Sequence, residues 1–114
     1  MTTKDKLMLQ KPIRSRLTED PDYTELIAEF VSNIPTRVRS IRHSIAANDS
    51  KQVNTLIHQL KGACGSYGFH EITPIASAIE HRIALGTEMS RLVSSIESLL
   101  EACLQMTAIP LDKT

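Results

Sequence analysis

Residues 49–68 of this 114-residue chain read DSKQVNTLIHQLKGACGSYG, and they contain the clearest helix signals in the sequence. Asp49 is a natural helix N-cap, with Gln52 three residues later able to return the hydrogen bond. Gly68 is a natural C-terminal stop. Between them the apolar residues recur every three or four positions, as on one stripe of an amphipathic helix: Val53, Leu56, Ile57, Leu60, Cys64 and Tyr67. We therefore predict a helix from about Ser50 to Tyr67.

The same period runs upstream of this stretch. Asp20-Pro21 is typical of a helix start, with Asp as the N-cap and Pro at the first helical position. The apolar stripe that follows keeps its register through Pro35: Ile27, Phe30, Ile34, Val38, Ile41 and Ile45. We predict one long helix kinked at Pro35, because proline removes a backbone hydrogen bond. Two separate helices are the alternative.

Two further helices are predicted downstream. The third begins between His70 and Pro74, stops at Gly86, and carries these residues inward: Ile72, Ile75, Ile79 and Ile83. Thr87 is predicted to cap the fourth helix, whose stripe is Met89, Leu92, Val93, Ile96, Leu99, Leu100 and Cys103. Pro110 lies beyond its end. Because connections this short make sequential helices antiparallel, the sequence predicts an all-α, up-down-up-down antiparallel four-helix bundle.

The length allows one domain, which we expect to span residues 1–114. Residues 1–19 form an N-terminal arm in this interpretation, and residues 20–108 form the helical bundle. Residues 1–11 show no clear period, and a short helix is expected around Ile13 to Leu17. The initial Met and the absence of a linker favour a free-standing protein over a module of a larger one.

Charge and cysteine content exclude several classes of function. Thirteen Lys and Arg balance thirteen Asp and Glu, so the chain lacks the basic surface expected of a nucleic-acid or anionic-membrane binder. It has no secretory signal and no apolar run near the ~20 residues that cross a bilayer, so we expect a cytoplasmic protein. Cys64 and Cys103 are too few for a disulfide framework and are expected in the core. No metal site is predicted, because the four histidines form no i, i+4 pair.

His58 lies on the opposite face of its helix, about 160° from the stripe centre near Leu60. Gly65 is two turns further on and almost in line with it, whereas Lys61 and Gly62 are one turn on. Two glycines inside a helix cost about 1 kcal/mol each relative to alanine, so this face clears space around an exposed imidazole. A neutral imidazole can attack as a nucleophile, and phosphoryl transfer requires an open approach and nearby positive charge.

These residues resemble a known family. The run from His58 to Gly68 is similar to the signature of histidine-containing phosphotransfer (HPt) domains. That signature has Leu-Lys-Gly at the second to fourth positions after the histidine and glycine at the tenth. The resemblance extends from about Tyr23 to Arg82. The first 11 residues and the last helix match only in general character.

The resemblance implies a role for each residue of the site. His58 accepts a phosphoryl group on its outer ring nitrogen, Lys61 balances the phosphoryl charge, and Gly62 leaves space for it. Glu80, on the next helix, matches the position that accepts a hydrogen bond from the other ring nitrogen. Gly65 stands where many members carry Ser or Ala, so this face is more open here.

The resemblance also implies a phosphorelay intermediate in two-component signalling. Such a protein exchanges a phosphoryl group with an aspartate of a response-regulator receiver domain, or receives it from a hybrid histidine kinase. It is a phosphocarrier that neither binds ATP nor turns over independently, and it needs no cofactor, because Mg²⁺ is expected in the partner receiver. We expect a monomer. The alternative is a non-catalytic helical adaptor that docks a signalling partner without phosphotransfer.

Two surface features remain from the sequence. Candidates for an apolar docking patch are Ile13, Leu17 and Phe69. The remaining histidines and a basic cluster are interpreted as solvated surface residues: His43, His70, His81, Arg37, Arg39 and Arg42.

Overall fold

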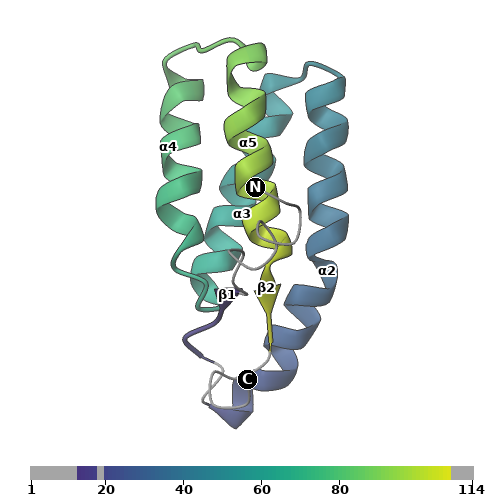
Figure 1. The fold of residues 1–114 in the computed structure, drawn as a ribbon, viewed down its shortest axis with the longest axis vertical. Helices are drawn as coiled ribbons and strands as arrows, with labels where there is room; N and C mark the ends of the chain where they lie inside the picture. Colours follow the sequence, from purple (N-terminus) through teal and green to yellow (C-terminus); the bar gives the residue numbers. More distant parts are fainter. Residues whose placement is uncertain (1–12, 18–19, 109–114) are drawn as a thin grey trace, which may run out of the picture.

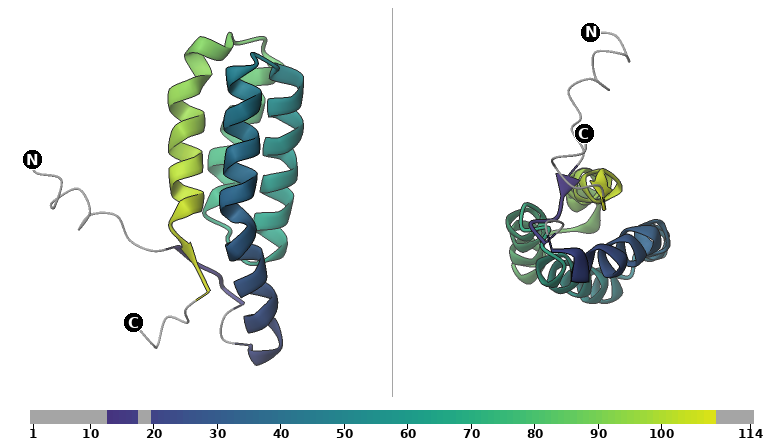
Figure 2. Two further views of the ribbon diagram at one scale, coloured as in Figure 1. Left: turned by 90° about the vertical axis from the view of Figure 1, so that its right-hand side faces the viewer. Right: turned by 90° about the horizontal axis from the view of Figure 1, so that it is seen from below.

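Four antiparallel helices make up most of the computed structural model, which describes residues 13–17 and 20–108 (Figure 1). They are α2 (Pro21–Ala46), α3 (Ser50–Ser66), α4 (Ile72–Ala84) and α5 (Met89–Leu104). Each helix packs against the next along the chain, and α5 returns to pack against α2. Figure 2 shows the four running alongside one another. The predicted all-α four-helix bundle is confirmed.

The first helix is continuous. The Asp20 carboxylate accepts a hydrogen bond from the Asp22 backbone N–H at 3.0 Å, and Pro21 occupies the first turn, where no hydrogen bond is lost. The helix then runs through Pro35 to Ala46. One helix is therefore correct and the two-helix alternative is wrong, because the buried stripe holds the segment in register on both sides of the proline.

The helix α3 begins and ends as its local sequence predicts. The Asp49 carboxylate accepts a hydrogen bond from the Gln52 backbone N–H at 3.1 Å. The helix ends at Ser66, one residue before the predicted end, and Gly68 follows with a φ of 86°. This left-handed conformation lets the chain turn sharply, so that the Phe69 N–H reaches the Cys64 carbonyl at 2.8 Å.

Two details of the later helices differ from the prediction. Ile75 is 38% exposed, because Ala76 occupies the inward position between Ile72 and Ile79. Thr87 does not cap α5 through its side chain. The helix begins after Glu88, and no side chain caps its first turn. The Thr87 N–H instead bonds the Arg82 carbonyl at 3.1 Å, so this residue completes the end of α4.

The core is aliphatic, with one aromatic cluster at the end of the bundle where α3 stops. The Phe30 ring stacks on Tyr67 with centroids 4.5 Å apart, and Phe69 lies 5.9 Å from Phe30. Phe69 is fully buried, so its expected role in an exposed docking patch is wrong. Cys64 and Cys103 are free thiols in this core, as predicted. Interaction with the Cys64 thiol, together with burial, raises the pKa of Cys103.

The N-terminal segment is a strand and not the predicted short helix. Ile13–Arg14 forms β1, which pairs in parallel with β2 (Met106–Thr107) beside the end of α5 (Figure 2). The Ile13 backbone N–H donates a hydrogen bond to the Gln105 carbonyl, just after α5, at 2.8 Å. A helix this short is marginal in water, so pairing with the bundle prevails. The expectations for residues 1–11 and for Pro110 lie outside the described residues.

The residues after β1 attach this segment to the turn that follows α3. Ser15 is buried, and its hydroxyl donates to the Tyr67 carbonyl and accepts from the Leu17 N–H. The Arg16 N–H donates to the Gly68 carbonyl at 3.0 Å. Because Ile13 and Leu17 are half-buried against the core, they do not form the free apolar patch that the sequence indicated. The N-terminal segment is therefore part of the packed structure.

Candidate functional site

His58 lies in the middle of α3 with 68% of its side chain exposed. The buried residues of the same helix lie on its other face: Val53, Ile57, Leu60 and Cys64. The outward orientation predicted from the helical period is therefore present. The ring is neither packed among aliphatic side chains nor enclosed, so its outer edge is open to a partner.

Glu80 of α4 holds one edge of this ring. The distance from His58 Nδ1 to Glu80 Oε2 is 2.9 Å. An ionised carboxylate only accepts hydrogen bonds, so this contact assigns the proton of a neutral ring to Nδ1. Nε2 then carries the free lone pair on the side away from Glu80. The close packing of α3 against α4 brings these residues, 22 positions apart, into contact.

Lys61 contacts the same carboxylate. Its Nζ lies 2.7 Å from Glu80 Oε1, so the two oxygens of one carboxylate face two donors from a single turn of α3. Lys61 is 26% exposed and Glu80 is 19% exposed. Burial of the Glu80 carboxyl opposes its ionisation, but hydrogen bonds from Lys61 and His58 outweigh this and lower its pKa. The carboxylate is therefore charged at neutral pH.

Two glycines leave the backbone bare beside the ring. A Cβ atom added at Gly62 or at Gly65 would have no neighbour within 4 Å outside its own helix. Internal packing therefore does not require a glycine at either position, although each costs about 1 kcal/mol relative to alanine. The bare surface is instead suited to close approach by another molecule, which supports the space-clearing interpretation.

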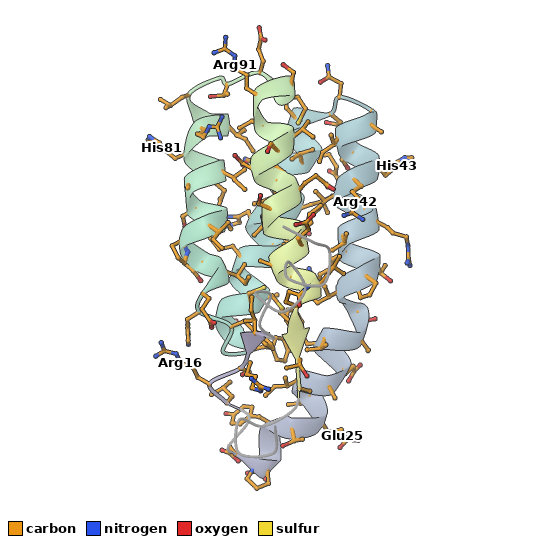
Figure 3. All side chains as sticks on the ribbon, viewed as in Figure 1. Arg16, Glu25, Arg42, His43, His81 and Arg91 are labelled. Atoms are coloured by element: carbon orange, nitrogen blue, oxygen red, sulfur yellow. The ribbon has the colours of Figure 1, made fainter. Side chains whose placement is uncertain are left out.

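The other candidate residues lie elsewhere. His43 and His81 point outward from α2 and α4 (Figure 3), and His70 is also exposed. In the basic cluster, Arg42 pairs with Glu97 of α5 at 3.0 Å, and Arg37 lies over the Phe30 ring. Among residues 13–17 and 20–108, no group of three or more His, Cys, Asp or Glu side chains is placed to hold a metal ion.

The Lys61–Glu80 ion pair was not predicted from the sequence. The helical period places Lys61 beside His58, and the family resemblance assigns Glu80 to the ring, but neither shows that the two side chains meet. Such a contact depends on how α4 is rotated against α3. The available signal was weak: a lysine one turn from the histidine, and one acid on the next helix.

Comparison with protein families gives a match that fits this geometry. The model of the Hpt domain family matches residues 25–108, which include His58, Glu80 and most of the bundle. The chain belongs to the Hpt domain family. Membership of this family implies histidine phosphotransfer in phosphorelay signalling, and Hpt domains interact with kinases and response regulators. No curated protein and no solved structure matches the chain.

The geometry of this Hpt domain suits a surface-to-surface reaction. The exposed ring stands on a helix whose neighbouring glycines leave the backbone accessible. Within the described part of the chain, no helix has the length and apolar character required to cross a membrane.

Proposed function

We propose that His58 accepts a phosphoryl group on Nε2 and exchanges it with an aspartate of a response-regulator receiver domain. One observation carries this proposal: the ring is exposed, with Nδ1 held by Glu80 at 2.9 Å and Nε2 facing outward. A neutral ring held in this way presents its lone pair to the partner. The bare backbone at Gly62 and Gly65 supports close docking of the partner's active site.

The transfer step needs no group that releases or collects a proton. The Nε2 lone pair attacks the phosphorus of an aspartyl phosphate, the P–O bond to the aspartate breaks, and the carboxylate leaves. The Nδ1 proton stays in place, and the ring gains positive charge. The Glu80 carboxylate stabilises that charge. The reverse step returns the phosphoryl group to an aspartate.

The partner supplies the remaining electrostatic stabilisation in this proposal. Phosphoryl transfer requires positive charge on the migrating oxygens. We assign that role to Mg²⁺ held by the receiver. On this chain, the positive charge close to the reacting ring is the Lys61 ammonium. The protein needs no bound cofactor or nucleotide for this reaction.

Label transfer from a phosphorylated receiver tests the proposal. The receiver is phosphorylated with ³²P and mixed with the protein, and the label on each chain is followed over time. We expect the protein to acquire label that is lost in acid and kept in base, as a phosphoramidate is. A protein that binds the receiver without acquiring label would support the adaptor alternative.

We expect Gly62→Val to slow phosphoryl transfer without unfolding the bundle. The added side chain meets no atom of its own chain within 4 Å of its Cβ, so the structural cost is about that of a helix-propensity change. It would, however, stand where the partner approaches, and a displacement of about 1 Å can cost about 100-fold in rate. Quenched time courses of label transfer measure the rate, and a thermal melt measures the stability of the bundle.

The matched control is Ala28→Val, at an exposed position of α2. It places the same β-branched side chain on a helix surface and is expected to leave the transfer rate unchanged. Equal rates for Gly62→Val and Ala28→Val would show that the bare backbone has no role in docking.

We expect Glu80→Ala to slow transfer about tenfold without abolishing it. This loss is smaller than the rate contribution of about 10²–10⁴-fold that is typical of a general acid or base. Glu80 orients the ring and stabilises its charge but transfers no proton. Single-turnover transfer from the receiver at saturating concentration measures the change. A wild-type rate in this variant would remove Glu80 from the site.

A further inference from the structure

The charges around His58 present a problem for a nucleophilic ring. A carboxylate 2.9 Å from Nδ1 favours the imidazolium form of a histidine. The imidazolium has no free lone pair, because both nitrogens carry protons. Glu80 alone would therefore orient His58 correctly but would also favour its unreactive form.

Lys61 is placed to offset this effect. Its ammonium lies 2.7 Å from Glu80 Oε1, on the oxygen that His58 does not use. The positive charge partly neutralises the carboxylate, and it also disfavours a second positive charge on the nearby ring. The Lys61 ammonium is therefore paired within the site before any phosphoryl group arrives.

No other described charged group is placed to do the same. The charges that act on Glu80 are those of Lys61 and His58. On α4 itself, Arg82 points to α5, where it donates to the Ser95 hydroxyl at 2.9 Å, and His81 is exposed. From α2, Arg37 lies over the Phe30 ring.

We propose that Lys61 is a positioning residue that acts through Glu80, keeping His58 neutral with its proton on Nδ1 and its lone pair on Nε2. The use of that lone pair for phosphoryl acceptance rests on the proposed function, but the charge state of the ring does not. Lys61 thereby allows Glu80 to orient the ring without protonating it.

The first test measures the ring directly in the unphosphorylated protein. The His58 imidazole signals are followed by NMR against pH in wild type, Lys61→Met and Lys61→Arg. We expect the titration midpoint of Lys61→Met to rise by about 0.5–1 pH unit, at the low end of charge effects because the ring is mostly exposed. Lys61→Arg keeps the charge and should stay near wild type.

The matched control is Lys51→Met, which removes an exposed lysine of the same helix two turns before His58. It should leave the midpoint unchanged. An unmoved midpoint in Lys61→Met, or an equal rise in Lys51→Met, would overturn the proposal.

A double variant tests whether Lys61 acts through Glu80. Glu80→Gln removes the negative charge and leaves Lys61 unpaired. The titration midpoint of His58 in this variant should therefore fall below that in wild type. Combining Lys61→Met with Glu80→Gln should leave the midpoint close to that of Glu80→Gln alone, because Lys61 then has no carboxylate to act through. If Lys61→Met raises the midpoint equally in both backgrounds, Lys61 acts on the ring directly and the route through Glu80 is wrong.

Phosphoryl acceptance against pH gives a functional readout. Only the neutral ring has a free lone pair on Nε2. Lys61→Met should therefore accept label several-fold more slowly than wild type at a pH between the two NMR midpoints, and at nearly the wild-type rate at a pH well above both midpoints. A defect of constant size at both pH values would overturn the proposal, because it would place the lysine on the phosphoryl group itself. If the wild-type protein accepted no label, the proposed function would fail, and the NMR titration would still decide this inference.

Discussion

Replacement of His58 by Gln is expected to abolish phosphoryl acceptance and leave the bundle intact. The amide of glutamine has no basic nitrogen lone pair, so no bond to phosphorus can form, and label should fall about a thousandfold or more, below detection. The side chain is 68% exposed and contributes no buried contact to the core, so stability should change by less than about 0.5 kcal/mol. Label transfer from a phosphorylated receiver and a urea melt measure the two quantities.

His81→Gln is the control for this experiment. His81 is also exposed on a helix, but it lies on α4 and is not hydrogen-bonded to Glu80 (Figure 3). It should accept label at the wild-type rate. If wild type and His58→Gln acquired label equally, the phosphorelay role of His58 would be wrong, because the label would then be carried by another residue.

Replacement of Gly68 by Ala is expected to produce the largest loss of stability. Two effects add at this position. The backbone has a φ of 86°, which costs an alanine about 1–2 kcal/mol. A Cβ would also overlap the Ser15 hydroxyl and lie 3.0 Å from Leu17 Cγ. We expect a total loss of about 2–4 kcal/mol, because crowding of a packed site adds to the backbone strain.

The Ser15 hydroxyl cannot move aside freely. It donates to the Tyr67 carbonyl and accepts from the Leu17 N–H, so displacing it breaks the attachment of the N-terminal segment to the turn after α3. Urea unfolding followed by circular dichroism measures the loss. In a thermal melt, we expect Tm to fall by roughly 10 °C or more.

Gly86→Ala separates the two effects. Gly86 has a φ of 81°, but a Cβ there would meet no atom within 4 Å. It should therefore lose only the backbone contribution of about 1–2 kcal/mol. Equal losses at the two glycines would mean that the N-terminal segment does not pack against Gly68 in solution.

Much of this fold follows from local patterns in the sequence. Apolar residues at helical spacing predicted four helices, and the Asp20 and Asp49 caps and the left-handed Gly68 and Gly86 lie where the sequence placed them. The exposed orientation of His58 followed from the same periodicity. These features depend on residues within a few turns of one another, so one helix at a time is enough to predict them.

The errors lie where two elements meet. Ile75 was assigned to the core because isoleucine fits an apolar stripe, but the rotation of α4 against its neighbours turns Ala76 inward instead. Phe69 follows the helix end and looked available for docking, but it is buried beside Phe30. Residues 13–17 lack any local signal for a strand, and only the free backbone groups at the end of α5 make pairing favourable.

Local sequence patterns were enough to predict four amphipathic helices, their order, and an exposed histidine on the outer face of one of them. Spacing along a single helix decides each of these, because side chains three and four residues apart share a face. The contact of one α4 carboxylate with both His58 and Lys61 of α3 arises instead from the packing of the two helices. Contacts of this kind depend on the rotation and depth of packing between two helices, which the whole core sets and no local pattern contains.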